Sequence, residues 1–148
     1  MKILVAVDGS GFSEKAVQAL ISQTRMQDAE VLVLEVVEPL MYSAPPQMAP
    51  GYAPDMAARQ EEHVKIARQT VNATADKLRS AGFKKVDSRT VEAETRSGIL
   101  AIADEWKPDL IVLGSHGRRG LQRFFLGSVA EGVARHAKSS VLIVRDAA

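Results

Sequence analysis

The 148-residue chain contains no cysteine, and this absence removes several classes of function at once. Without thiols there is no disulfide framework, no thiolate metal site and no cysteine nucleophile. Histidine is also scarce, and His63, His116 and His136 do not have the spacing of a metal-binding motif. No G-x-S-x-G nucleophile elbow is present. We therefore identify no catalytic residue and no protein metal site.

Long apolar runs and a strong net charge are missing as well. No stretch reaches the roughly 18 apolar residues of a membrane span. The apolar run at the start is interrupted at Asp8, before it reaches the roughly 7–15 residues of a signal peptide. The formal net charge of +1 gives no strong attraction to nucleic acid or to anionic lipid. We expect a cytoplasmic protein that binds neither membranes nor nucleic acid.

What the sequence does contain is a regular alternation of short apolar runs and helical patterns. Strands are predicted at 2–8, 30–38, 84–92, 109–114 and 140–145. The run at 84–92 is more polar than the others and is typical of an edge strand. This alternation predicts one α/β domain over 1–148, a doubly wound, Rossmann-like parallel sheet with helices on both faces. Ligands of such sheets bind beyond the carboxyl ends of the strands.

Residues 38–58 have an unusual composition. This segment holds five of the six prolines and both tyrosines, too many prolines for a helix or a central strand. We predict a flexible loop here. It is either a connection without chemistry or a lid over a site at the carboxyl edge, because long loops are often functional.

The stretch "GSHGRRGLQRFFLGS" (114–128) combines four glycines and three arginines with no acid. Glycines let backbone N–H groups converge on a phosphate, and the start of a following helix favours an anion. Ser128 and Glu131 also fit a capping box, a structural role that is compatible with a phosphate contact. The stretch is not a Walker loop, because it lacks G-x-x-x-x-G-K-[ST].

Asp8 ends the first predicted strand, at the edge where a ligand would lie. Its carboxylate can accept hydrogen bonds either from ribose hydroxyls or from the backbone of the turn that follows. The residues alone do not decide between the two roles.

Taken together, "ILVAVDGS", "DLIVLGSHGRRG" and "LGSVAEGVARHAKSSVLIVR" resemble the universal stress protein family along the whole chain. The pattern G-x2-G-x9-G-[ST] of the ATP-binding branch of this family is matched by Gly114, Gly117, Gly127 and Ser128.

The resemblance implies a five-stranded sheet of order 3-2-1-4-5 and a homodimer formed through the last strand, 140–145. It also implies that ATP binds with Asp8 at the ribose and the main chain near Val36 at the adenine, with Mg held through the phosphates. The residues implied to surround the phosphates are Gly114, Ser115, His116, Gly117, Arg118, Arg119, Gly127, Ser128 and Val129.

From these features we predict an ATP-binding universal stress protein that acts as a nucleotide-dependent switch in a stress response, with an unidentified protein partner. Two alternatives stay open. One is a slow Mg-dependent ATPase, and the other is a dimeric interaction protein that binds no nucleotide.

Overall fold

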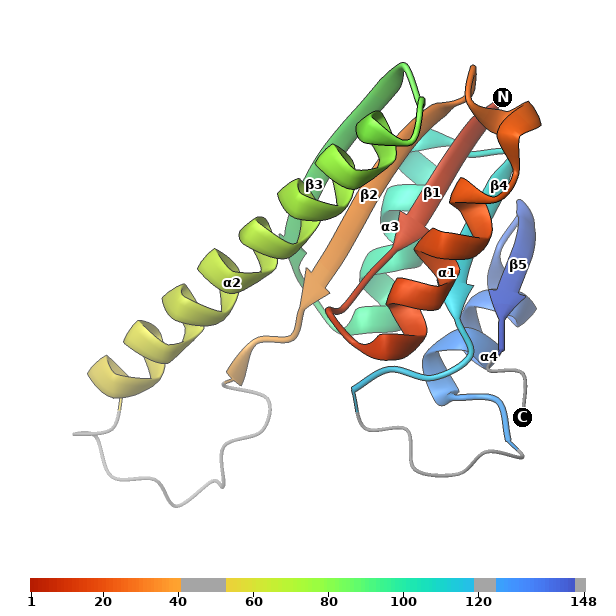
Figure 1. Cartoon of the computed structure of the whole chain (residues 1–148). Coiled ribbons are helices and arrows are strands. Elements are labelled where there is room, and N and C mark those ends of the chain that lie inside the picture. The colour runs from red at the N-terminus through yellow and green to blue at the C-terminus, as the bar shows by residue number, and fades with distance from the viewer. Residues whose placement is uncertain (41–52, 119–124, 146–148) are drawn as a thin grey trace.

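The computed structural model describes residues 1–40, 53–118 and 125–145 and confirms the predicted α/β fold (Figure 1). Five parallel strands form one sheet in the order β3-β2-β1-β4-β5. The strands are β1 (Lys2–Ala6), β2 (Glu30–Val37), β3 (Lys85–Glu92), β4 (Leu110–Gly114) and β5 (Ser140–Val144). The more polar run predicted as an edge strand is β3, which ends the sheet on one side.

Helices cover both faces of the sheet, as Figure 1 shows. The helices are α1 (Gly11–Ile21), α2 (Ala53–Ser80), α3 (Thr95–Trp106) and α4 (Ser128–His136), with a short 3₁₀ turn at Thr24–Met26. Helices α1 and α2 pack on one face, and α3 and α4 pack on the other.

The alternation of side chains along the central strands produces two hydrophobic cores. Ile3 and Val5 of β1 face α1 and α2, whereas Leu4 faces α3 and α4, and all three are fully buried. Continuous apolar runs such as "ILVA" in β1 are required because both faces of a parallel sheet are covered.

Since all five strands are parallel, their carboxyl ends lie at one edge of the sheet (Figure 1). The chain leaves β1 toward β2 on one side and later returns to β4 on the other side of β1. The connections therefore diverge between β1 and β4, and this divergence leaves a crevice at the carboxyl edge.

The loop predicted at 38–58 ends earlier in the structure than the sequence suggests. Helix α2 begins at Ala53, so residues 53–58 are helical and not part of a loop. Pro54 is tolerated because the first turn of a helix contains N–H groups that have no acceptor within the helix. Residues 41–52, where the rest of that prediction falls, lie outside the described part of the chain. Within the described part, every helix is too short or too polar to cross a lipid bilayer.

Candidate functional site

A cleft of about 490 Å³ opens at the carboxyl edge of the sheet. Nine of the residues predicted to bind ATP line it: Asp8, Val36, Gly114, His116, Gly117, Arg118, Gly127, Ser128 and Val129. Ser115 is only 3% exposed and lies beneath the cleft wall. Arg119 falls outside the described residues.

Helix α4 points its N-terminus at this cleft, and its start differs from the capping box that the sequence predicts. The N-cap is Gly127, in an extended conformation and without a side-chain cap, and Ser128 is the first helical residue. The cap shifts because the Gly127 N–H donates to the Ser115 carbonyl at 2.8 Å, which fixes where the helix begins. Glu131 pairs with Arg135 at 2.8 Å instead. Among the described residues, no side chain caps the first-turn N–H groups of α4.

Glycine is required where this loop approaches other backbone. A Cβ atom on Gly127 would lie 2.9 Å from the Ser115 carbonyl oxygen, and one on Gly114 would lie 2.7 Å from the Phe12 backbone. Both distances are shorter than any ordinary contact of a Cβ atom. Gly114 thus lets the end of β4 pack directly on α1, and Gly127 lets the start of α4 pack directly on Ser115.

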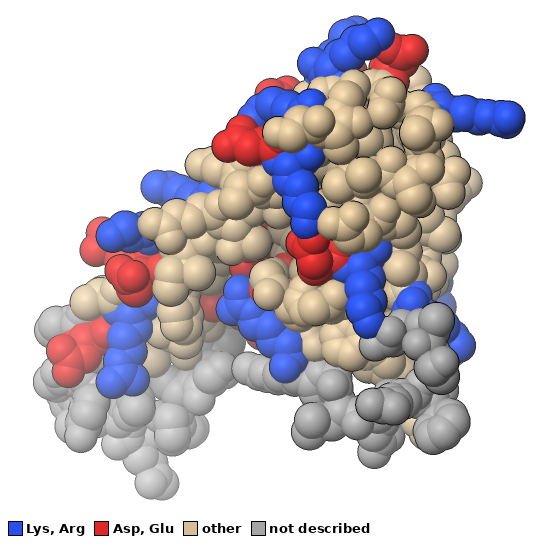
Figure 2. Space-filling view, in the orientation of Figure 1, with Lys and Arg blue, Asp and Glu red and all other residues tan. Residues whose placement is uncertain are grey.

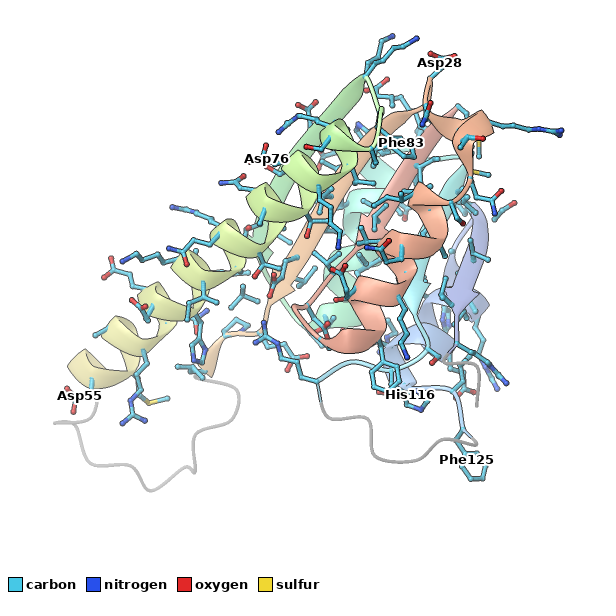
Figure 3. The ribbon with its side chains drawn as sticks, in the orientation of Figure 1. Asp28, Asp55, Asp76, Phe83, His116 and Phe125 are labelled. Atoms are coloured by element: carbon cyan, nitrogen blue, oxygen red, sulfur yellow. The ribbon has the colours of Figure 1, made fainter. Side chains whose placement is uncertain are left out.

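His116 lies at the carboxyl edge of the sheet, where Figure 3 labels it. Its Nδ1 is 3.1 Å from the Ser115 hydroxyl, and its ring is tilted against Phe12 with 5.2 Å between ring centroids. These two contacts orient the imidazole in the cleft wall. Neither contact is with a carboxylate, the partner that would activate the imidazole as a general base.

The Asp8 carboxylate organises the loops around it. Its Oδ1 accepts from the Ser10 N–H at 2.9 Å, and its Oδ2 accepts from the Arg118 N–H at 3.0 Å. The turn-stabilising role that the sequence left open is therefore present, and it reaches across to the loop after β4. Each oxygen keeps a second lone pair with which to accept from a ligand hydroxyl.

Glu35 is a member of the site that the sequence analysis did not identify. It lies in β2, is only 4% exposed and lines the cleft. Its Oε1 accepts from Arg118 Nη2 at 3.0 Å, while Oε2 has no partner among the described residues. Burial raises the pKa of Glu35, Arg118 lowers it, and Asp8 raises it further, with a net increase. The acid within the apolar run "VLVLEVV" was the available signal, because a buried charge needs a partner.

The β2 end of the cleft combines an apolar wall with further polar groups. Val36, Ile99 and Leu113 contribute apolar surface. Glu38 is bonded to the first residue of α3: its Oε1 accepts from the Thr95 hydroxyl at 2.8 Å and from the Thr95 N–H at 3.3 Å. This end therefore suits a flat apolar group with polar edges, and its negative charge does not suit an anion.

A metal site built from side chains alone is not found in the described part of the chain. No three His, Asp or Glu residues there come together as possible ligands.

Several solved structures share this fold. Universal stress protein UspA from Lactobacillus plantarum superimposes with a TM-score of 0.84 at 24% identity, covering 98% of this chain and 97% of that one. A universal stress protein in complex with cAMP gives a TM-score of 0.71 at 23% identity, covering 99% and 98% of the two chains. An Arabidopsis thaliana family member with AMP bound gives 0.67 at 17% identity, covering 100% and 93%.

Sequence comparison gives a more specific relation. A putative universal stress protein of Staphylococcus aureus strain USA300 is 32% identical over 144 residues, which cover 97% of this chain and 82% of that protein. The model of the universal stress protein family matches residues 1–145. The cleft at the carboxyl edge of this sheet is thus part of a domain that belongs to the universal stress protein family.

Proposed function

We propose that this protein binds ATP in the cleft at the carboxyl edge of the sheet and acts as a nucleotide-dependent switch. The observation that carries the proposal is the N-terminus of α4, which faces the cleft without a side-chain cap. Free N–H groups and the helix dipole together favour an anion at this position. Phosphates would bind there, between Ser128 and Val129 of the first turn and the loop at Gly117.

The remaining predicted contacts fit the other end of the same molecule. Asp8 retains acceptor capacity for ribose hydroxyls, and Val36 lies beside an apolar wall that would accommodate a base. Main-chain groups near Val36 at the end of β2 would contact the adenine.

The structural relatives support an adenine nucleotide as the ligand class, since one is a complex with cAMP and another has AMP bound. The preference for ATP rests on the intact pattern of Gly114, Gly117, Gly127 and Ser128. A Mg²⁺ ion would be held through the phosphates, which supply the oxygen ligands that this cation prefers.

A switch accounts for the site better than an efficient enzyme does. His116 faces a hydroxyl and an aromatic ring, and Asp8 accepts backbone N–H groups, so neither is arranged as a general base. Any turnover would be slow, with charge stabilisation as its main source. A partner surface near the cleft would respond to whether nucleotide is bound.

The test is an equilibrium titration of Mg-ATP into nucleotide-stripped protein, with Gly127→Val as the variant. Valine at this position forces the loop away from the Ser115 carbonyl and should weaken binding at least about tenfold, a loss of 1.4 kcal/mol or more. Gly11→Ala is the matched control, because a Cβ atom there meets nothing within 4 Å. Circular dichroism verifies that both variants are folded.

Saturable binding by wild type and Gly11→Ala, lost in folded Gly127→Val, is the expected result. If wild type binds no adenine nucleotide in a direct assay, the proposal is wrong, and the interaction-protein alternative takes its place.

We also infer that two copies pair through β5, which ends the sheet opposite β3. Leu142 on this strand is 39% exposed. An edge strand also has unpaired backbone N–H and C=O groups along its free side, which can pair with a second chain. Leu142→Glu should shift the protein from dimer to monomer in sedimentation experiments. A wild-type chain that remains monomeric at all accessible concentrations contradicts the inference. The cytoplasmic location and the protein partner stay predictions from the sequence.

A further inference from the structure

We propose that Glu35 is a positioning residue that couples nucleotide binding to proton uptake: it holds Arg118 in the ligand-free cleft, and it takes a proton from solvent when phosphates draw Arg118 away. This inference rests on the proposed nucleotide function and adds to it a residue and a linkage that neither the sequence motif nor the family fold supplies.

Arg118 is held against the acidic part of the cleft at three points. Its backbone N–H donates to Asp8 Oδ2 at 3.0 Å, its Nε donates to the Asp8 carbonyl, and its Nη2 lies 3.0 Å from Glu35 Oε1. The side chain is nevertheless 60% exposed, so it is free to leave without disturbing the core. In this position the guanidinium bonds the Glu35 carboxylate and the Asp8 carbonyl, while the Asp8 carboxylate accepts from the Arg118 backbone.

Glu35 depends on this contact because it is buried. Its side chain is 5% exposed, and Oε2 has no hydrogen-bond partner in the described part of the chain. A buried carboxylate that loses its only cation becomes an unpaired charge, which is costly. Taking up a proton on Oε2 removes that charge, and this is the cheaper outcome.

The other groups around Glu35 do not replace Arg118. Asp8 at the end of β1 is a second carboxylate and raises the pKa of Glu35. Thr90 of β3, directly opposite in the register, offers a neutral hydroxyl that is itself buried and has no partner among the described residues. His63 of α2 and His116 of the loop after β4 line the same cleft, and Glu38 lines it just after β2.

The charge of the cleft explains why phosphates would move Arg118. Among the described lining residues, Asp8, Glu35 and Glu38 are the carboxylates, and Arg118 is the sole lysine or arginine. A polyphosphate at the α4 N-terminus meets repulsion from these carboxylates, and this repulsion falls when Arg118 turns toward the phosphates. The Arg118 guanidinium is suited to that exchange because it binds phosphate in a bidentate manner. Its departure leaves Glu35 between Asp8 and a new anion, which favours the protonated form.

The first experiment measures protons directly. Mg-ATP is titrated calorimetrically into wild type in two buffers of different ionisation enthalpy, and the difference in heat gives the protons taken up. We expect uptake by wild type and a clearly smaller uptake by Glu35→Gln. Glu30→Gln, on the same strand at the opposite edge of the sheet, is the matched control and should behave as wild type. Proton changes of ATP itself are common to all three proteins and cancel in the comparison.

Affinity gives a second readout with a defined sign. At about pH 8, Glu35→Gln should bind Mg-ATP about tenfold more tightly than wild type, because no buried charge is left behind. The two affinities should converge as the pH falls, since a proton then neutralises Glu35 in wild type.

Arg118→Gln keeps the test decisive if Glu35→Gln fails to fold. It removes the exposed partner and leaves Glu35 without a cation before any ligand arrives. We expect Arg118→Gln to bind nucleotide more weakly than wild type, whereas Glu35→Gln binds it more tightly. Both variants should take up fewer protons than wild type.

The outcomes separate this inference from the function on which it rests. If nucleotide binds with a proton number and pH dependence that neither variant alters, the inference is wrong and the nucleotide function stands. If wild type binds no nucleotide at all, both are wrong.

Discussion

The two edges of the sheet carry similar charged groups in different surroundings. At the amino edge, Asp28 pairs with Lys84 at 2.6 Å, and the two side chains are 82% and 73% exposed. At the carboxyl edge, Asp8 and Glu35 share Arg118, and Glu35 is almost fully buried. Figure 3 labels Asp28 and His116 at these opposite ends of the molecule.

The comparison shows that solvent exposure, more than the number of charges, decides what a charged group can do. Exposed pairs are screened by water and contribute little. Figure 2 shows many such side chains of both signs along α2, where they keep the surface polar. A buried carboxylate responds strongly to any change in its partner, so chemistry and linkage concentrate at the carboxyl edge.

The largest expected effect is a loss of Mg-ATP affinity when an aspartate is changed at the carboxyl edge but not when one is changed at the amino edge. Asp8→Asn should weaken Mg-ATP binding at least about tenfold, because it removes a charged acceptor from the proposed ribose contact and loosens the Arg118 N–H bond. Asp109→Asn is the control at the amino edge, where Asp109 Oδ2 accepts from the Lys2 N–H at 2.6 Å. Equilibrium binding measures both. Equal affinities for the two variants would remove Asp8 from the proposed site.

An intermediate effect concerns stability as a function of pH. The pKa of Glu35 is raised by burial in the folded chain, so the folded state holds the proton more tightly than the unfolded state. The ordinary pKa of a glutamate is 4.5. As the pH rises from 4.5 through the raised pKa of Glu35 in the folded chain, the unfolded chain loses this proton first, and the free energy of unfolding falls. Glu35→Gln should lack this decline.

Denaturant unfolding of the ligand-free protein at several pH values measures the decline. The Glu30→Gln control should retain it. A parallel pH dependence in wild type and Glu35→Gln would show that Glu35 carries no buried charge in the folded chain.

The smallest effect is expected at the amino edge. The pKa of Asp28 is lowered by its hydrogen bond and charge interaction with Lys84, but both side chains are largely exposed to water. Asp28→Asn should leave the thermal midpoint and nucleotide binding unchanged within error. A clear loss of stability would show that exposed pairs at this edge matter more than the comparison allows.

Much of the fold could be predicted from the sequence because the pattern of apolar residues along a strand or helix indicates which of its faces are buried. Apolar runs predicted four of the strands, and the more polar run at 84–92 predicted the fifth as an edge strand. The glycines of the 114–128 stretch likewise indicated the loop that lines the cleft, since close approach of backbone excludes larger residues.

Other features depend on tertiary contacts that no local pattern contains. Ser128 and Glu131 satisfy a capping box by spacing, yet the bond from Gly127 to Ser115 moves the cap by one residue. Glu35 lies in a run that reads as buried strand, and its partner Arg118 is 83 residues away. The start of α2 inside a proline-rich segment was missed because Pro54 is unfavourable everywhere in a helix except its first turn.

The strand order has a consequence for how the site comes into being. Asp8 and Glu35 come from the first half of the chain, Arg118 and Gly127 come from the second, and the Asp8–Arg118 bond spans 110 residues. The second half joins the first where β3 pairs with β2 and where β4 pairs with β1. Neither half alone contains the whole cleft, and contacts of such long sequence separation slow folding. Nucleotide binding would therefore report that the whole chain has reached its native topology.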